Sequence, residues 1–219
     1  MNAAVADVLT STEPKTATIH AQLDREIDGL LSSLPDPAHL SAVERRGIIA
    51  RYSAVLEGNF IYWMTGAYLA AGSDEARAKI VDNLREEVRD CHPGMLRRFA
   101  IAAAAAPNDA DAQAVAHRLS DVRLFIGRLS PVPIVVTMAF FEGFIQRFMP
   151  YLAELAKRQG SSEMEYTDVH GICDITHTEE LFRALDAELE LTPPLPNEAI
   201  FEGVGLLRTL IANIVDERR

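Results

Sequence analysis

The sequence predicts an all-α protein, a single bundle of seven or eight helices, and three observations lead to this fold class. Hydrophobic residues make up 48% of the chain and recur at helical spacing almost throughout, and no segment alternates as a half-buried strand does. Alanine is abundant and only 7% of the residues are aromatic, which favours helices over strands. Proline and glycine separate the periodic segments at short intervals, as expected for one bundle with short loops.

Eight periodic segments are expected to be helical, and their ends coincide with capping or breaking residues. Ser41 and Glu44 have the spacing of a capping box, and Ser73 and Asn108 can cap later helices. A stiff connector with three prolines, 193–196, precedes the last helix. The expected helices span about residues 19–34, 41–71, 73–90, 94–106, 108–129, 130–159, 162–189 and 198–217.

Residues 1–16 are expected to form a disordered leader, and residues 17–219 a single domain. The leader is small, polar and mixed in charge, and it lacks the basic start and apolar core of a signal peptide. The longest apolar stretch, 131–145, carries Glu142 and is too short to span a bilayer. We therefore expect a protein that is not in a membrane.

Charge and cysteine content narrow the class of partner and compartment. The formal net charge of −11 argues against non-specific binding to nucleic acid or to an anionic membrane. The two cysteines, Cys91 and Cys173, belong to no CxxC pair, so a disulfide scaffold is not expected. A reducing, cytoplasmic setting is the natural expectation.

The segment that runs from His170 through Asp174 to His177 is the most informative part of the chain. On a helix, Asp174 and His177 lie roughly 40° and −20° from His170, so the three side chains share one narrow face over two turns. Imidazole nitrogen and carboxylate oxygen are donors that first-row transition metals such as iron prefer. The alternative is a polar helix face exposed to solvent.

Two other segments offer further donors. Glu142 lies among apolar neighbours, where burial requires a counter-charge or a metal; the alternative is a polar stripe paired with an arginine. Glu86 and Glu87 precede His92, but neither faces it on an unbroken helix, so a bend beside Pro93 is required. The alternative for both glutamates is an ordinary solvated position.

The remaining histidines and one cysteine are expected to play lesser roles. His20, His39 and His117 lack such partners and are expected to be structural or surface residues. Cys173 lies beside the predicted donor face and could bind a metal, but with harder donors nearby packing is its expected role.

These three segments, in this order, resemble the haem-oxygenase-like dimetal oxidases and oxygenases. That family uses a seven-helix bundle that binds no haem in these members. Its ligands are a glutamate and a histidine close together, a lone glutamate two helices later, and a His-x-x-x-Asp-x-x-His helix. The resemblance covers about residues 45–185, and the family's Asn-Leu-x-x-Glu run selects Glu87, with Glu86 as the other choice. Family members have more residues between this glutamate and its histidine than this chain has.

The resemblance implies two ferrous ions, with a manganese–iron pair as the alternative, and O2 as cosubstrate. The first ion would take two ligands of its own, the second would take three, and one glutamate would bridge them. The implied ligands of the first ion are Glu87 and His92, and those of the second are His170, Asp174 and His177. Glu142 is the implied bridge. Glu57, in another apolar stretch, is expected to be a catalytic carboxylate or conditional ligand, with a buried ion pair as the alternative.

The implied function is N-oxygenation, oxidative C–C cleavage or desaturation of a small amino acid or related carboxylate, in a biosynthetic pathway. A small-molecule substrate, an electron donor and a second copy of the chain in a homodimer are the expected partners. Arginine is a suitable residue to hold a substrate carboxylate because it pairs bidentately. The candidate substrate contacts are the aromatic walls Tyr62, Trp63, Phe141 and Phe144 and the arginines Arg123 and Arg147.

Two other functions are alternatives to a dimetal oxygenase. A metal-free, thiaminase-type enzyme of the same fold would need Cys91 or Cys173 as a nucleophile, and it would leave the histidine and carboxylate pattern unexplained. A non-catalytic bundle that binds a metal is the third candidate. A ferritin-type version would show Glu-x-x-His pairs, and none occurs in the sequence.

Overall fold

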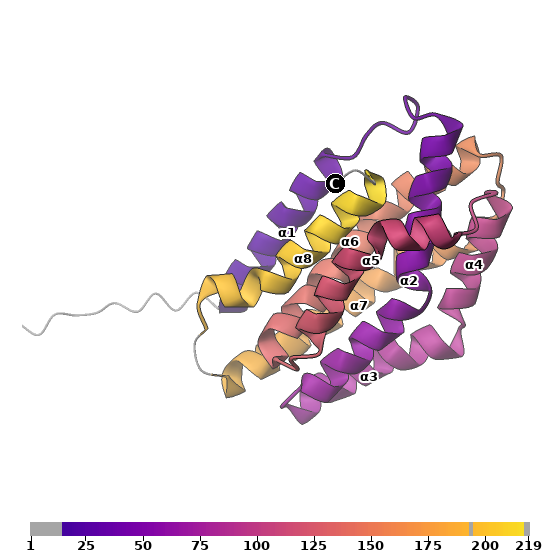
Figure 1. The fold of residues 1–219 in the computed structure, drawn as a ribbon. Helices are drawn as coiled ribbons and strands as arrows, with labels where there is room; N and C mark the ends of the chain where they lie inside the picture. The colour runs from indigo at the N-terminus through magenta and orange to yellow at the C-terminus, as the bar shows by residue number, and fades with distance from the viewer. Residues whose placement is uncertain (1–14, 193–194, 217–219) are drawn as a thin grey trace, which may run out of the picture.

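The computed structural model describes residues 15–192 and 195–216, and these residues form eight α-helices and no strand, which confirms the all-α prediction (Figure 1). Most of the expected leader and part of the proline connector lie outside the described residues. The helices are α1 (Lys15–Ser32), α2 (Ala42–Ala70), α3 (Asp74–Arg89), α4 (His92–Ala102), α5 (Asp109–Ile126), α6 (Pro131–Arg158), α7 (Glu165–Leu191) and α8 (Asn197–Val215).

The predicted caps are confirmed. The Ser41 side chain accepts from the backbone of Glu44, whose carboxylate accepts in return from the backbone N–H of Ser41. Ser73 and Asn108 cap α3 and α5 with their side-chain oxygens. The first described helix begins at Lys15, four residues before the predicted helix start at residue 19.

The turn between α3 and α4 supplies the bend that the sequence required. Cys91 has φ 56°, a left-handed conformation, and His92 follows as the first residue of α4 with Pro93 in its first turn. A Cβ on Gly94 would lie 2.8 Å from the Cys91 sulfur, so a larger residue there would require the Cys91 side chain to move. This short connection turns the His92 side chain back toward α3.

The predicted end of α4 is wrong by four residues. The helix stops at Ala102 because Ala104 adopts φ 51°, and the Ala105 N–H donates to the Ala100 carbonyl at 2.8 Å. This is a helix-terminating conformation that glycine usually adopts, so an alanine there gives no signal in the sequence.

The core lies around α6, which packs against α1, α2, α7 and α8. Figure 1 shows α3 and α4 on one side of the bundle and α1 and α8 on the other. α6 is apolar and long enough to pass a composition test for a membrane span, but 83% of the tested window is buried, as for a central core helix. α3 and α4 contact α7, which contacts α6 most extensively, so these four helices surround one common interior region.

Candidate metal centre

Between residues 170 and 177, α7 buries polar residues and exposes apolar ones, the reverse of an ordinary amphipathic helix. His170, Asp174 and His177 are 5%, 0% and 2% exposed. Ile172 and Ile175, on the other side of the helix, are 73% and 50% exposed. The alternative of a solvated polar face is therefore wrong, and some other interaction must compensate for burying these groups.

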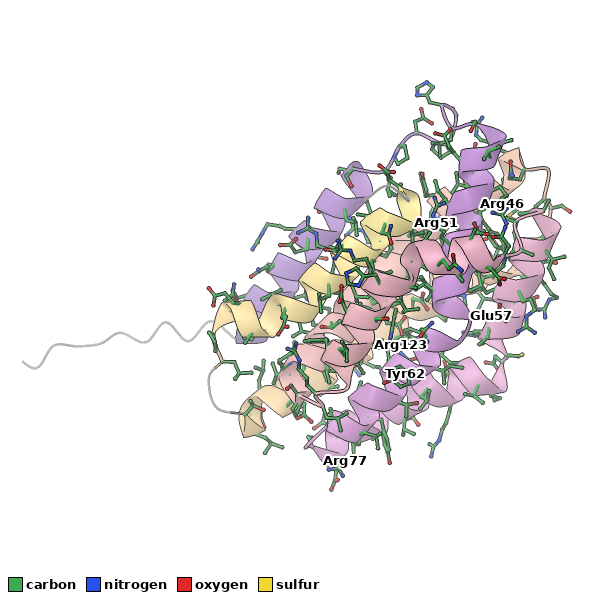
Figure 2. The ribbon with its side chains drawn as sticks, in the orientation of Figure 1. Arg46, Arg51, Glu57, Tyr62, Arg77 and Arg123 are labelled. Atoms are coloured by element: carbon green, nitrogen blue, oxygen red, sulfur yellow. The ribbon has the colours of Figure 1, made fainter. Side chains whose placement is uncertain are left out.

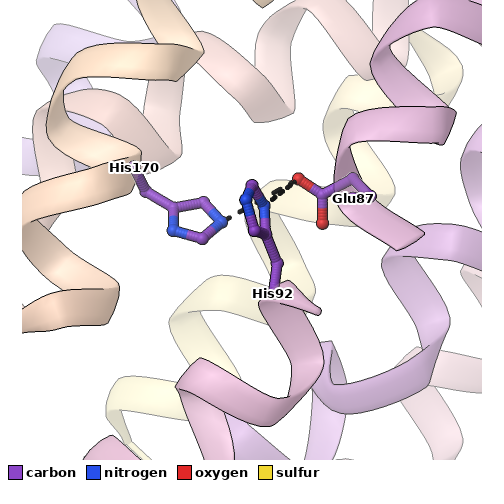
Figure 3. A group of neighbouring side chains, drawn as sticks. All are labelled: Glu87, His92 and His170. Carbon is purple, nitrogen blue, oxygen red and sulfur yellow. Dashed lines mark hydrogen bonds and ion pairs between the residues drawn. The ribbon is translucent and has the colours of Figure 1, made fainter. Parts of the chain in front are cut away.

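The first group of donors joins three helices: Glu87 from α3, His92 from α4 and His170 from α7 (Figure 3). The ligand atoms of the three all lie within 4.8 Å of one another. His92 Nδ1 is 2.6 Å from Glu87 Oε1, and His170 Nε2 is 3.9 Å from the same oxygen. Burial opposes protonation of His92, but the bond to Glu87 outweighs it and raises the pKa of His92.

The second group lies one to two turns further along α7. The ligand atoms of Cys173, Asp174 and His177 lie within 4.8 Å of one another. His177 Nδ1 is 3.6 Å from Asp174 Oδ1 and 3.8 Å from Glu142 Oε1, which α6 supplies. Glu142 is 2% exposed, and Asn83 on α3 donates its side-chain N–H to it at 2.8 Å. Among the described residues, Glu142 therefore pairs with an amide and a histidine and not with an arginine.

The structure groups the donors differently from the division that the resemblance implied. His170 was expected beside Asp174 and His177, but its ring lies against that of His92, with centroids 4.5 Å apart. The reason is helix geometry: seven residues along α7 correspond to about 10 Å of rise, so the two histidines of one helix reach different neighbours. His170 lies opposite α4, and His177 lies beside α3 and α6.

The histidines are oriented as metal-binding histidines commonly are. His170 Nδ1 donates to the Tyr166 carbonyl at 2.8 Å, which leaves Nε2 directed toward the first group. His177 Nε2 is bonded to Glu86 at 2.9 Å, which leaves Nδ1 directed toward the second group. Within the described part of the chain, His177 Nδ1 and Asp174 Oδ2 are buried without a hydrogen-bond partner. Such atoms fit a bound cation.

The charges of the cluster also fit a cation. Burial raises the pKa of Glu142 well above its usual value, and the Asp174 carboxylate adds to this shift. Burial by itself would lower the pKa of His177, but the carboxylates of Asp174, Glu142 and Glu86 outweigh it and raise the pKa to about 10. The histidine thus serves as a counter-cation to the carboxylates, and a metal would replace its proton.

A small cavity of about 20 Å³ reaches both groups, which is room for about one water molecule. Apolar side chains form most of its remaining wall. The lining residues are Leu56, Phe60, Ile61, Glu87, His92, Pro93, Leu96, Glu142, Ile145, Tyr166, His170 and Asp174.

Three predicted site residues, all labelled in Figure 2, lie outside the small cavity. Glu57 binds Arg97, with the Arg97 Nε 2.7 Å from its carboxylate, in a pair that is not buried. Arg123 donates to the Asn59 side chain at 2.9 Å, and Tyr62 is 48% exposed. None of the three lines the small cavity. Their apolar sequence context could not tell a helix face beside the metal site from one that packs on α4 or α5.

The other predicted aromatic walls belong to the core. Trp63, Phe141 and Phe144 are at most 2% exposed, and the first two pack edge to face at 5.2 Å. Arg147 pairs with Asp28 on α1. The three histidines expected to lie outside the site, His20, His39 and His117, are all exposed.

Sequence reasoning missed Tyr166, the contact of Asn83 with Glu142 and the contact of Glu86 with His177. Tyr166 packs on His170 with ring centroids 4.2 Å apart, and its hydroxyl lies 2.8 Å from that of Tyr52. The available signal was helical spacing, since Tyr166 lies four residues before His170 and Asn83 four before Glu87.

Comparison of the chain with protein-family models, with curated proteins and with solved structures finds no match.

Proposed function

We propose that this protein is an O2-activating, non-haem dinuclear iron oxidase or oxygenase of the haem-oxygenase-like type. Its proposed substrate is a small amino acid or related carboxylate. One observation carries the proposal: six nitrogen and oxygen donors from four helices converge in two adjacent buried groups, with a histidine nitrogen and a carboxylate oxygen left unpaired. A folded chain tolerates such a cluster when cations compensate for it.

The donor set suits two divalent first-row ions. Glu87, His92 and His170 would hold one ion. Asp174 and His177 would hold the other, with Glu142 as the third donor in place of the softer Cys173 sulfur. Three carboxylates offset three of the four positive charges, and the histidines bind as neutral imidazoles. An iron pair, when bound there, would supply the electrons and the coordination positions that O2 reduction needs, which side chains alone do not supply.

The chain itself controls water and protons around this pair. Leu56, Phe60, Leu96 and Ile145 give the cavity apolar walls, and the donors that line it are at most 5% exposed, which limits their contact with water. Burial raises the pKa of the Cys173 thiol, and its Sγ–H donates to Asp174 at 3.2 Å. A protonated, hydrogen-bonded thiol is a poor nucleophile, which argues against a thiaminase-type reaction at Cys173.

We further propose that the substrate occupies a separate cleft between α1, α6 and α7. The cavity at the donors is too small for an amino acid, whereas this cleft has a volume of about 240 Å³. Asp174 lines both cavities, so a molecule in the cleft lies next to the metal centre. Arg147 lines the cleft and could bind a substrate carboxylate in exchange for Asp28.

Iron loading tests the proposed function. Anaerobic addition of about two equivalents of ferrous iron per chain should give tight binding, and exposure to O2 should give a Mössbauer spectrum of two coupled ferric ions. Iron uptake without O2 consumption would reduce the proposal to a metal-binding bundle. Failure to bind iron, or binding of single uncoupled ions, would refute it.

A further inference from the structure

One face of α3 contacts three candidate ligands on three other helices. Asn83, Glu86 and Glu87 have the i, i+3, i+4 spacing of neighbours on one helix face. Glu87 bonds to His92 on α4, and the other two bond to candidate ligands on α6 and α7. α3 therefore helps to fix the orientation of donors in both groups.

The bond between Glu86 and His177 determines which ring nitrogen can bind a metal. His177 Nε2 lies 2.9 Å from Glu86 Oε2, and an ionised carboxylate only accepts, so Nε2 carries the hydrogen. In the neutral imidazole Nδ1 then keeps its lone pair. That nitrogen lies 3.6 Å from Asp174 Oδ1 and 3.8 Å from Glu142 Oε1 and has no hydrogen-bond partner among the described residues.

Asn83 acts on the other side of the same group. Its Nδ2–H donates to Glu142 Oε1 at 2.8 Å, and both side chains are buried. An amide can hold the carboxylate in place without competing for a metal as a charged ligand would.

We propose that Glu86 and Asn83 are positioning residues that orient His177 and Glu142 and do not themselves bind the metal. This assignment rests on the proposed metal centre, and it answers which of the two adjacent glutamates is the ligand. Glu87 is 4% exposed and lies within 4.8 Å of two histidines. The Glu86 side chain is 45% exposed and contacts the ring edge of His177 that faces away from Asp174 and Glu142.

Cobalt(II) binding to the full chain tests the assignment, because cobalt gives a visible spectrum and needs no turnover. Glu86→Gln keeps an oxygen that accepts the His177 N–H, whereas Glu86→Leu removes it. We expect Glu86→Gln to bind cobalt within about threefold of wild type and Glu86→Leu to bind about 10–100-fold more weakly. Asn83→Leu should weaken binding over a similar range, with Asn83→Ala as a second variant if the leucine disturbs folding.

Asp82→Asn is the matched control, because Asp82 is an exposed α3 carboxylate whose partner among the described residues is Arg85. It should bind cobalt as wild type does. A second readout is the paramagnetically shifted, exchangeable N–H signal of the cobalt-bound His177. This N–H should exchange faster with water in Glu86→Leu, while that of His170, bonded to the Tyr166 carbonyl, should not change.

The outcomes separate this assignment from the proposed function. Equal losses of cobalt affinity in Glu86→Gln and Glu86→Leu would make Glu86 a ligand and overturn the positioning role. Unchanged binding in Glu86→Leu would overturn it as well, and both results would leave the metal centre intact. If the wild-type protein binds no cobalt, the proposed metal centre fails and the assignment fails with it.

Discussion

Replacing Glu142 with glutamine should stabilise the metal-free protein while it weakens metal binding. Glu142 is 2% exposed on α6, and burial together with the charges of Asp174 and Glu87 disfavours its ionised form. Only His177 and Asn83 oppose this, so the net effect is a raised pKa. Glutamine has nearly the same shape, can still accept from Asn83 and carries no charge.

The sign of the pH dependence follows from this shift. A carboxyl group whose pKa is higher in the folded than in the unfolded state contributes most to stability at low pH. That contribution is lost as the pH rises from the unfolded value, about 4.5, through the folded value. His177, with a pKa near 10, loses its contribution as the pH rises from about 6.5 to 10. The wild-type protein without metal should therefore become less stable as the pH rises.

The magnitude is bounded by about 1.4 kcal/mol for each unit of raised pKa. Loss of the attraction between Glu142 and His177 offsets part of the gain in the variant, so we expect a net stabilisation of about 1–2 kcal/mol at pH 8. For a chain of this size that is a rise in melting temperature of about 2–8 °C. Near pH 5 the difference should nearly vanish.

Thermal unfolding in EDTA at pH 5 and pH 8, followed by circular dichroism, measures this difference. Titration with ferrous iron should show a loss of affinity in Glu142→Gln that exceeds the roughly 10–100-fold typical of losing an outer hydrogen-bond partner. An unchanged iron affinity would show that Glu142 is not a ligand. A melting temperature that is lower than wild type at pH 8, or a shift that is equal at both pH values, would refute the electrostatic reasoning.

Three further predictions concern other residues. His170→Ala should lose bound iron while it keeps its helical circular dichroism. His117→Ala, at an exposed position, should keep full iron content. A collapsed fold in His170→Ala would indicate a structural metal instead. Arg147→Gln should raise the KM for a carboxylate substrate about tenfold or more without changing iron content, and Arg123→Gln, which removes only the contact with Asn59, should leave KM unchanged. Gly203→Ala should lower the free energy of unfolding by about 3 kcal/mol, because its Cβ would lie 2.1 Å from Thr137 Oγ1 and 2.4 Å from the Phe125 ring. Gly205→Ala, which has open space around it, should not lower the melting temperature.

The sequence alone was enough to predict the helices and the face that His170, Asp174 and His177 share, because both depend on residues close together in the chain. Helical periodicity and caps such as Ser41 with Glu44 depend on residues three or four positions apart, and these predictions agree with the structure. The shared face of His170, Asp174 and His177 follows from helix geometry in the same way. Ala104 marks the limit of such reasoning, since an alanine in a left-handed conformation carries no local signal.

Only the tertiary structure decided which donors meet. Periodicity says which residues share a face, but not which face of another helix lies opposite, and that depends on packing between segments far apart in the chain. His170 therefore joined His92 and Glu87, and Glu86 reached His177 across 91 positions of sequence. Glu57 pairs with Arg97 of α4 for the same reason, since no local pattern shows that these two residues meet across 40 positions of sequence.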